Sequence, residues 1–307
     1  MNLHDVAQVF ATEDEAHEHL VKVRWPKGIR CLACDSDRIS RITSKGKTGK
    51  VRRVLECLEC GLQFTATSGT LFHDSHLPLR KWFMALALMC EAKKGISALQ
   101  LSRHLGVQHK TAWYLNHRIR EAMQEQNPKP LGSEGQIVEI DEVYIGGKKR
   151  NTGVKAGKDA KIAVLGMVER NGRIHLQKIP DTKLASIKPV VDAHLSPNAG
   201  GVATDGATTY ACIIPSGKHI AGNHSRELWN HGTITTTRTI DGAFSLLKRG
   251  LVGSYHQLSG DHIDAYLHEF CWRYDRRWQQ KTMFDSLLTN VAAGKPLTYK
   301  KLTREVF

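Results

Sequence analysis

The feature that most constrains this chain is an acid inside a short apolar run, in the stretch QIVEIDEVYIGG at residues 136–147. Ile137, Val138 and Ile140 are β-branched, and the alternation of apolar residues continues to a pair of glycines, which predicts a strand. Burying an unpaired carboxylate is costly. Asp141 therefore needs a metal ion or another cation as its partner.

Two further acids follow the same logic. Asp205 ends a short apolar run in GGVATDGATTY, and Asp241 opens a helical pattern in TIDGAFSLLKRG. Lys248 lies seven residues after Asp241, which places both on one helix face. Two metal ions about 4 Å apart, held by carboxylate oxygens, are what a two-metal phosphoryl-transfer site requires. The order of these residues predicts such a site, with Mg²⁺ or Mn²⁺ bound by Asp141, Asp205 and Asp241.

Each of the later acids has a simpler interpretation. An Asp-Gly pair after an apolar run is commonly a turn, which would explain Asp205. An acid at the start of a helix is favoured by the helix dipole, which would explain Asp241. The order of the three acids, each at the end of an element, favours the catalytic interpretation.

Two Cys-x-x-Cys pairs lie near the N-terminus, with 22 residues between them. This spacing is typical of a tetrahedral structural zinc site formed by two turns, with the ligands Cys31, Cys34, Cys57 and Cys60. A redox-active pair is the alternative. The small ribbon could not bury a core without the metal, so Zn²⁺ is predicted to be structural.

Basic residues concentrate between the two cysteine pairs, and the net charge of the chain is +14. Residues 44–53 predict a basic hairpin that binds phosphates without sequence preference, through Lys45, Lys47, Lys50, Arg52 and Arg53. A polyanion such as double-stranded DNA is the expected partner. A basic protein with a solvated loop is the alternative.

A helical region follows the cysteines. Helices are expected from residue 79 to Gly95, from Ala98 to Leu105, and from about Gln108 to Met123, with Ser97 as a cap and a turn at Gly106. Helices joined in this way predict a helix-turn-helix that presents five side chains to DNA: Gln108, His109, Lys110, Tyr114 and Arg118. A three-helix module that only packs is the alternative.

The remaining pattern predicts an α/β domain. Residues 1–24 are expected to form an acidic helix containing a Thr12–Glu15 capping box. After a linker, strands are expected at residues 137–145, 161–169 and 173–179, with a turn at Asn171-Gly172. A helix at 182–195, a strand ending at Asp205, an irregular region with His219, His224 and His231, and the helix from Asp241 complete the order of an RNase H like fold.

No apolar run is long enough to cross a membrane, and the N-terminus lacks the order of a signal peptide. The protein is therefore expected to be cytoplasmic and to have no membrane partner.

Taken together, these motifs resemble the bacterial insertion-sequence transposases that join a zinc ribbon to an ISXO-like DDE catalytic domain. The resemblance covers nearly the whole chain and is carried by LVKVRWPKGIRCLAC, CLECGLQFTATSGTLF, LPLRKWFMALALM, KKGISALQLSRHLGVQHKTAWYLNHRIREAM, EIDEVYIGGK, TDGATTY, SLLKRGLVGSYH and YLHEFCWRYDRR. It implies cleavage of the element's inverted repeats and strand transfer into target DNA with a divalent metal. Asp141 and Asp205 match the family's first two acids, Lys248 its trailing lysine, and the paired cysteines its zinc ligands.

The chain departs from the family pattern at the third acid. The family usually has Glu in a motif Asn-Thr-Ile-Glu, whereas this chain has Arg238-Thr-Ile-Asp241, and Ala243 stands where a bulky residue is usual. Aspartate is one methylene shorter than glutamate, and Arg238 adds a cation nearby. A transposase-derived DNA-binding protein whose catalytic domain has decayed is therefore the main alternative. A hydrolase of small phosphates would need neither DNA-binding module.

The predicted protein is multidomain, with a four-cysteine zinc ribbon, an all-α helix-turn-helix and an α/β RNase H like domain. The expected segments are a helix at 1–24, the ribbon at 25–68, the helix-turn-helix at 72–126, a linker at 127–136, the catalytic domain at 137–290 and a tail at 291–307. A homo-oligomer assembled on DNA is expected.

Overall fold

The computed structural model describes the chain apart from residues 46–50, 147–160, 223–236, 256–257, 259 and 305–307. The chain divides into two compact units, which are described separately. The first unit is Met1–Met123 together with Gln279–Phe307, and the second is Gln124–Trp278. The expected domain end at residue 290 and the expected C-terminal tail therefore differ from the structure, which assigns residues after 278 to the first unit.

The first unit begins with two helices rather than the single expected one. They are α1 (Leu3–Val9) and α2 (Glu13–Arg24). The predicted capping box starts α2: the Thr12 hydroxyl accepts a bond from the Glu15 amide at 3.2 Å, and the Glu15 carboxylate accepts one from the Thr12 amide at 2.7 Å. A second capping box at Asn2 starts α1, so the break lies between two separately capped helices.

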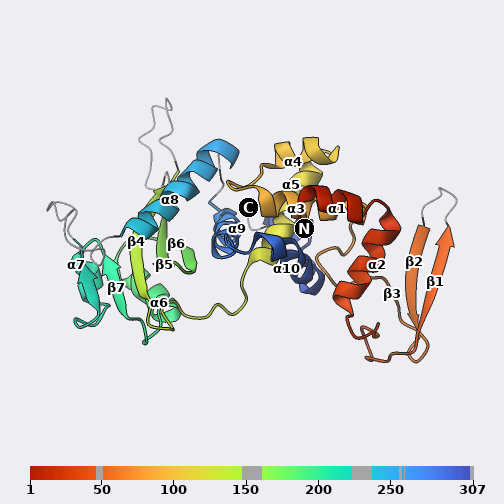
Figure 1. Cartoon of the computed structure of the whole chain (residues 1–307), viewed down its shortest axis with the longest axis horizontal. Coiled ribbons are helices and arrows are strands. Elements are labelled where there is room, and N and C mark those ends of the chain that lie inside the picture. The colour runs from red at the N-terminus through yellow and green to blue at the C-terminus, as the bar shows by residue number, and fades with distance from the viewer. Residues whose placement is uncertain (46–50, 147–160, 223–236, 256–257, 259, 305–307) are drawn as a thin grey trace. The chain divides into compact units, whose positions relative to one another are not determined.

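A small antiparallel sheet carries the cysteine pairs. Its strands are β1 (Ile39–Lys45), β2 (Val51–Cys57) and β3 (Gln63–Phe64), in the order β1-β2-β3 (Figure 1). Arg24 at the end of α2 donates to the carbonyls of Ala66 and Ser68, at 2.8 Å and 2.6 Å. These bonds tie the chain that leaves the sheet to α2.

The helical part of the first unit contains α3 (Leu79–Glu91), α4 (Ala98–Leu105) and α5 (His109–Met123). The Ser97 hydroxyl caps α4, and Gly106 ends it in the left-handed conformation, with φ 59°, as predicted.

Two C-terminal helices, α10 (Gln280–Ala293) and α11 (Tyr299–Arg304), complete the unit. Helix α10 packs against α2, α3 and α5, and Phe284 contacts the rings of Phe10 and Phe83. This aromatic packing is why these residues belong to the helical core.

The second unit contains a mixed five-stranded sheet in the order β6-β5-β4-β7-β8 (Figure 1). Strands β4 (Ile137–Ile145), β5 (Ile162–Glu169) and β6 (Ile174–Ile179) are antiparallel, whereas β7 (Gly201–Thr204) runs parallel to β4, and β8 (His219–Ala221) runs parallel to β7. Asn171 adopts the left-handed conformation in the predicted β5–β6 turn, with φ 60°. The predicted strands are confirmed to within a residue.

Helices lie on both faces of this sheet. They are α6 (Leu184–His194), the short α7 (Thr208–Ala211), α8 (Arg238–Gly250), which continues into a π-helical turn at Leu251–Tyr255, and α9 (Ile263–Asp275). Helix α8 begins three residues earlier than expected, so Asp241 lies in its first turn. His219 lies in β8, and His224 and His231 lie outside the described residues.

The strand alternation of β4 sends its side chains into two separate cores. Val138 and Ile140 pack in a core with residues of α6, whereas Val143 and Ile145 pack in a core with residues of α8 and α9. Odd-numbered residues of β4 therefore face α8, and Asp141 is one of them. Among the described residues, no helix is both long and apolar enough to span a membrane.

Candidate functional site

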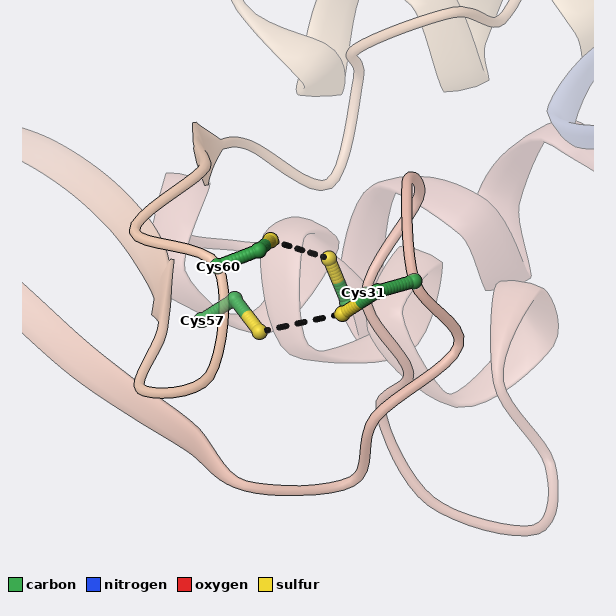
Figure 2. A group of neighbouring side chains, drawn as sticks. Cys31, Cys57 and Cys60 are labelled. Atoms are coloured by element: carbon green, nitrogen blue, oxygen red, sulfur yellow. Dashed lines mark hydrogen bonds between the residues drawn. The ribbon is translucent and has the colours of Figure 1, made fainter.

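The four paired cysteines form a compact cluster. Their four sulfur atoms lie within 4.8 Å of one another. Cys31, Cys57 and Cys60 point toward one another (Figure 2), and the sulfur of Cys31 lies 3.5 Å from that of Cys60. The sulfur of Cys34 lies 3.6 Å from that of Cys57. Four thiolates at such spacing fit one tetrahedral Zn²⁺ ion.

The two turns that carry these cysteines are built alike. Each ends on a residue with left-handed backbone, Asp35 with φ 57° and Gly61 with φ 71°. The amide of each residue donates back to the carbonyl of the first cysteine, at 3.2 Å for Cys31 and 2.9 Å for Cys57. Backbone amides, those of Cys34 and Ala33, lower the pKa of the Cys31 thiol to about 6. A depressed pKa favours the thiolate, which is the form that binds zinc.

The second candidate site starts from the pairing of β4 with β7. Ile137, Val138 and Glu139 lie opposite Gly201, Val202 and Ala203. Continuing this register by two residues beyond the paired segment brings Asp205 beside Asp141. Asp205 then lies just past the carboxyl end of β7, beside Asp141 in the middle of β4. The carboxyl ends of parallel strands are where α/β sheets commonly form their sites.

Helix α8 packs against the sheet at a glycine next to Asp141. Gly166 of β5 lies opposite Asp141, and a Cβ at Gly166 would lie 2.6 Å from the Phe244 ring and 2.9 Å from the Ile240 side chain. The missing side chain lets α8 pack directly on the sheet next to Asp141. Asp241 follows Ile240 in the first turn of α8, and its carboxylate accepts a bond from the Thr237 hydroxyl at 3.3 Å.

The electrostatics show that these acids share one region. Burial raises the pKa of Asp141 to about 6, and the negative charges of Glu142, Asp241 and Asp205 contribute to the rise. Within the described part of the chain, however, only the cysteine cluster brings three ligand atoms within 4.8 Å of one another. The carboxylates are therefore neighbours but not a closed cluster. Carboxylates that lie close together repel one another unless a cation lies between them. Hard divalent cations such as Mg²⁺ and Mn²⁺ prefer such oxygen ligands.

Three exposed cations accompany Asp241 on α8, namely Arg238, Lys248 and Arg249. Lys248 lies seven residues further along the helix, and Arg238 is its first residue. The predicted placement of Lys248 on the same helix as Asp241 matches the structure.

Sequence reasoning missed a buried pair on the opposite face of β4. The hydroxyl of Tyr210, which is 1% exposed, donates to the Glu142 carboxylate at 2.7 Å. Burial raises the pKa of both groups, and the charges of Glu142, Asp141 and Asp205 add to the rise at Tyr210. The motif ATTYACI gave no signal for this contact, because Tyr210 meets Glu142 only through the fold.

The structure separates the residues predicted to bind DNA. On the β1–β2 hairpin, Lys45 and Arg52 are exposed, whereas the guanidinium of Arg53 forms an ion pair with Asp14 of α2. Lys47 and Lys50 lie outside the described residues. Arg53 is therefore engaged within the protein.

The helix α5 shows a similar division. Gln108, His109 and Lys110 are exposed, but the Tyr114 hydroxyl donates to the carbonyl of Leu297. Arg118 is only 3% exposed and donates to the His73 carbonyl at 2.5 Å. Its guanidinium also stacks on Trp82. The prediction that Arg118 faces DNA is wrong, because this side chain holds the helical core together.

Comparison with known proteins supports the zinc ribbon and identifies a transposase domain. The family model for the transposase zinc-ribbon domain matches residues 11–63, and that for the ISXO2-like transposase domain matches residues 133–275. An uncharacterized protein in transposable element ISH50 of Halobacterium salinarum is 31% identical over 138 residues, which is 45% of this chain and 44% of the relative. No solved structure matches. The chain, which carries both domains in this order, belongs to the family of insertion-sequence transposases with a zinc ribbon and an ISXO2-like transposase domain.

Proposed function

We propose that this transposase cleaves the ends of its insertion sequence and joins the freed ends to target DNA by two-metal phosphoryl transfer. The observation that supports the proposal is the register of β4 and β7, which brings Asp205, just past the end of β7, beside Asp141 in the middle of β4, close enough to Asp241 of α8 for the charges of both acids to raise the pKa of Asp141.

The three aspartates would hold the divalent metal ions. Bound metal would neutralise developing charge and activate the attacking oxygen. In the first step, water attacks a phosphodiester at the element end and a 3′ hydroxyl leaves. In the second step, that hydroxyl attacks a phosphodiester of target DNA, forming one bond as another breaks. The exposed Lys248 would contact a DNA phosphate near the reacting strand.

The DNA would be held by exposed basic and polar side chains of the first unit. Lys45 and Arg52 on the hairpin would contact phosphates, and Gln108, His109 and Lys110 at the start of α5 would contact bases. The net charge of +14 supports a polyanionic partner. Assembly of two or more copies on paired DNA ends is part of this proposal.

An Mn²⁺-dependent cleavage and strand-transfer assay on the flanking repeats tests the proposal. Asp141→Asn should abolish both steps and leave DNA binding intact. Asp181→Asn is the matched control, because Asp181 is an acid of the same unit whose partners among the described residues are Ser186 and Lys183, near the start of α6. Wild-type protein that binds the repeats and cleaves nothing would overturn the proposal.

That last outcome would favour the second candidate, a DNA-binding protein with a decayed catalytic domain. The observation that favours it is the start of α8, where Asp241 stands in place of the longer Glu and Arg238 adds a positive charge three residues earlier. Such a protein would occupy element ends without reacting with them.

A further inference from the structure

Glu139 is an acid that the proposed chemistry does not use. It lies in β4, two residues before Asp141 and on the same face, and it is 1% exposed. A buried carboxylate is costly unless it is paired and hydrogen-bonded.

The partners of Glu139 come from the start of α8. One carboxylate oxygen accepts bonds from the amides of Thr239 and Ile240, at 2.8 Å and 3.0 Å. The other accepts from the Thr239 hydroxyl at 2.9 Å and from Nε of Arg170 at 2.8 Å. Both oxygens are thus engaged by protein donors, so Glu139 is not placed to ligate a metal.

This arrangement replaces the missing local cap of α8. Thr237 stands at the cap position, but its side chain makes no capping bond. Free amides at a helix start are stabilised by an anion. Glu139 supplies that anion from a strand about 100 residues away in sequence, and so fixes the first turn of α8 on β4.

We propose that Glu139 is a positioning residue for Asp241. Glu139 accepts bonds from the amides of Thr239 and Ile240, and Ile240 directly precedes Asp241. Glu139 also lies in the same strand as Asp141, two residues before it. The carboxylate therefore sets the position of the third acid relative to the first. The inference rests on the proposed function only in taking Asp241 as a metal ligand.

The test compares Glu139→Gln with Glu169→Gln. Glu169 is a matched control, because it is a 5% exposed carboxylate on β5 whose bonds come from Gly132 and Arg173 and not from the start of α8. Mn²⁺ binding is measured by electron paramagnetic resonance on full-length protein at matched folded fraction. Loss of an outer partner of a metal ligand typically weakens metal binding 10- to 100-fold, so Glu139→Gln should raise the Mn²⁺ dissociation constant about 10-fold or more.

Two further measurements make the result decisive. The double variant Glu139→Gln with Asp241→Ala should bind Mn²⁺ no more weakly than Asp241→Ala alone, because both changes act on one ligand. Hydrogen exchange at the amides of Thr239 and Ile240 should accelerate at least 10-fold in Glu139→Gln and stay unchanged in Glu169→Gln. Thr239→Val, which removes one donor and keeps the shape, should show a smaller shift in the same direction.

Unchanged exchange at Thr239 and Ile240 in Glu139→Gln would overturn the positioning role, whatever the activity. Additive losses of Mn²⁺ affinity in the double variant would also overturn it, because Glu139 would then act independently of Asp241. If the wild-type protein neither binds Mn²⁺ nor cleaves DNA, the proposed function fails. In that case the hydrogen-exchange rates of Thr239 and Ile240 in Glu139→Gln, compared with wild type, still decide whether Glu139 holds the first turn of α8.

Discussion

The zinc ribbon and the carboxylate site differ in how their ligands are brought together. The four cysteines come from two similar turns within 30 residues of sequence, and their sulfur atoms already form a closed cluster. The three aspartates come from β4, from the residue after β7 and from α8, spread over about 100 residues, and their oxygens do not close on one another. Local backbone geometry therefore builds the first site, whereas tertiary packing builds the second.

The two regions also differ in how much they depend on metal. The apolar core of the ribbon is small, with Leu55 and Phe64 packed against Trp25, Ile29 and Ile39. The sheet of the second unit has a full apolar core on each face. Metal should therefore be needed for folding in the ribbon and for chemistry alone at the carboxylates.

The largest expected effect is the unfolding of the zinc ribbon when one of its ligands is replaced. Cys57→Ser should remove zinc and unfold residues 25–66, because structural zinc supplies about 10–16 kcal/mol in small zinc domains. The second unit should stay folded. Metal analysis by mass spectrometry and hydrogen exchange of β2 and β4 measure the two responses. Native protein without stoichiometric zinc, or a protected β2 in Cys57→Ser, would contradict the prediction.

The next effect concerns the third carboxylate. Asp241→Ala should abolish Mn²⁺-dependent cleavage, whereas Asp241→Glu should preserve or raise the rate by restoring the longer side chain usual in this family. A misplacement of about 1 Å can cost about 100-fold in rate, so the two variants should differ by at least that factor. Cleavage rates of the wild type and both variants, measured at matched folded fraction, test whether Asp241 is a metal ligand. Equal rates in all three proteins would make Asp241 only a helix-start acid, with a cost of about 1 kcal/mol in the Ala variant.

The same contrast explains what the sequence could predict. Local patterns were sufficient for the cysteine turns, for the Thr12 capping box and for the bounds of β4, because each depends on residues close in sequence.

Contacts between distant segments were not predictable. Nothing near Glu139 in sequence indicates that it caps a helix at residue 239, and nothing near Arg53 indicates its ion pair with Asp14. Arg118 was assigned to DNA because Ala112, Leu115 and Ile119 were expected to form the inward face of the helix, yet its guanidinium lies over the Trp82 ring. Residues 280–290 were expected in the catalytic domain, whereas α10 lies in the first unit and packs against α2, α3 and α5.

A third prediction sharpens the dependence of the carboxylate site on packing. Gly166→Ala should destabilise the second unit by about 1–3 kcal/mol, because the new methyl group would overlap Phe244 and Ile240 and push α8 from the sheet. Mn²⁺ affinity should fall with it. Chemical denaturation and Mn²⁺ titration measure both. Gly217→Ala is the control, since a Cβ there would meet nothing within 4 Å. Phe244→Leu in the Gly166→Ala background should recover part of the loss, and failure to do so would show that overlap with the Phe244 ring is not its cause.

The smallest expected effect distinguishes the stability of α8 as a helix from the packing of α8 against the sheet. Gly242 lies in α8 directly after Asp241, its φ is not left-handed, and an added Cβ would meet nothing within 4 Å. Replacing a glycine inside a helix with alanine is worth about 0.5–1 kcal/mol, so Gly242→Ala should stabilise the second unit by that amount in chemical denaturation. Mn²⁺ affinity should not change, because the helix already stands where Glu139 and Gly166 place it. If Gly242→Ala instead raised Mn²⁺ affinity several-fold, fraying of the first turn of α8 would limit metal binding, and the position of Asp241 would depend on helix stability as well as on the sheet.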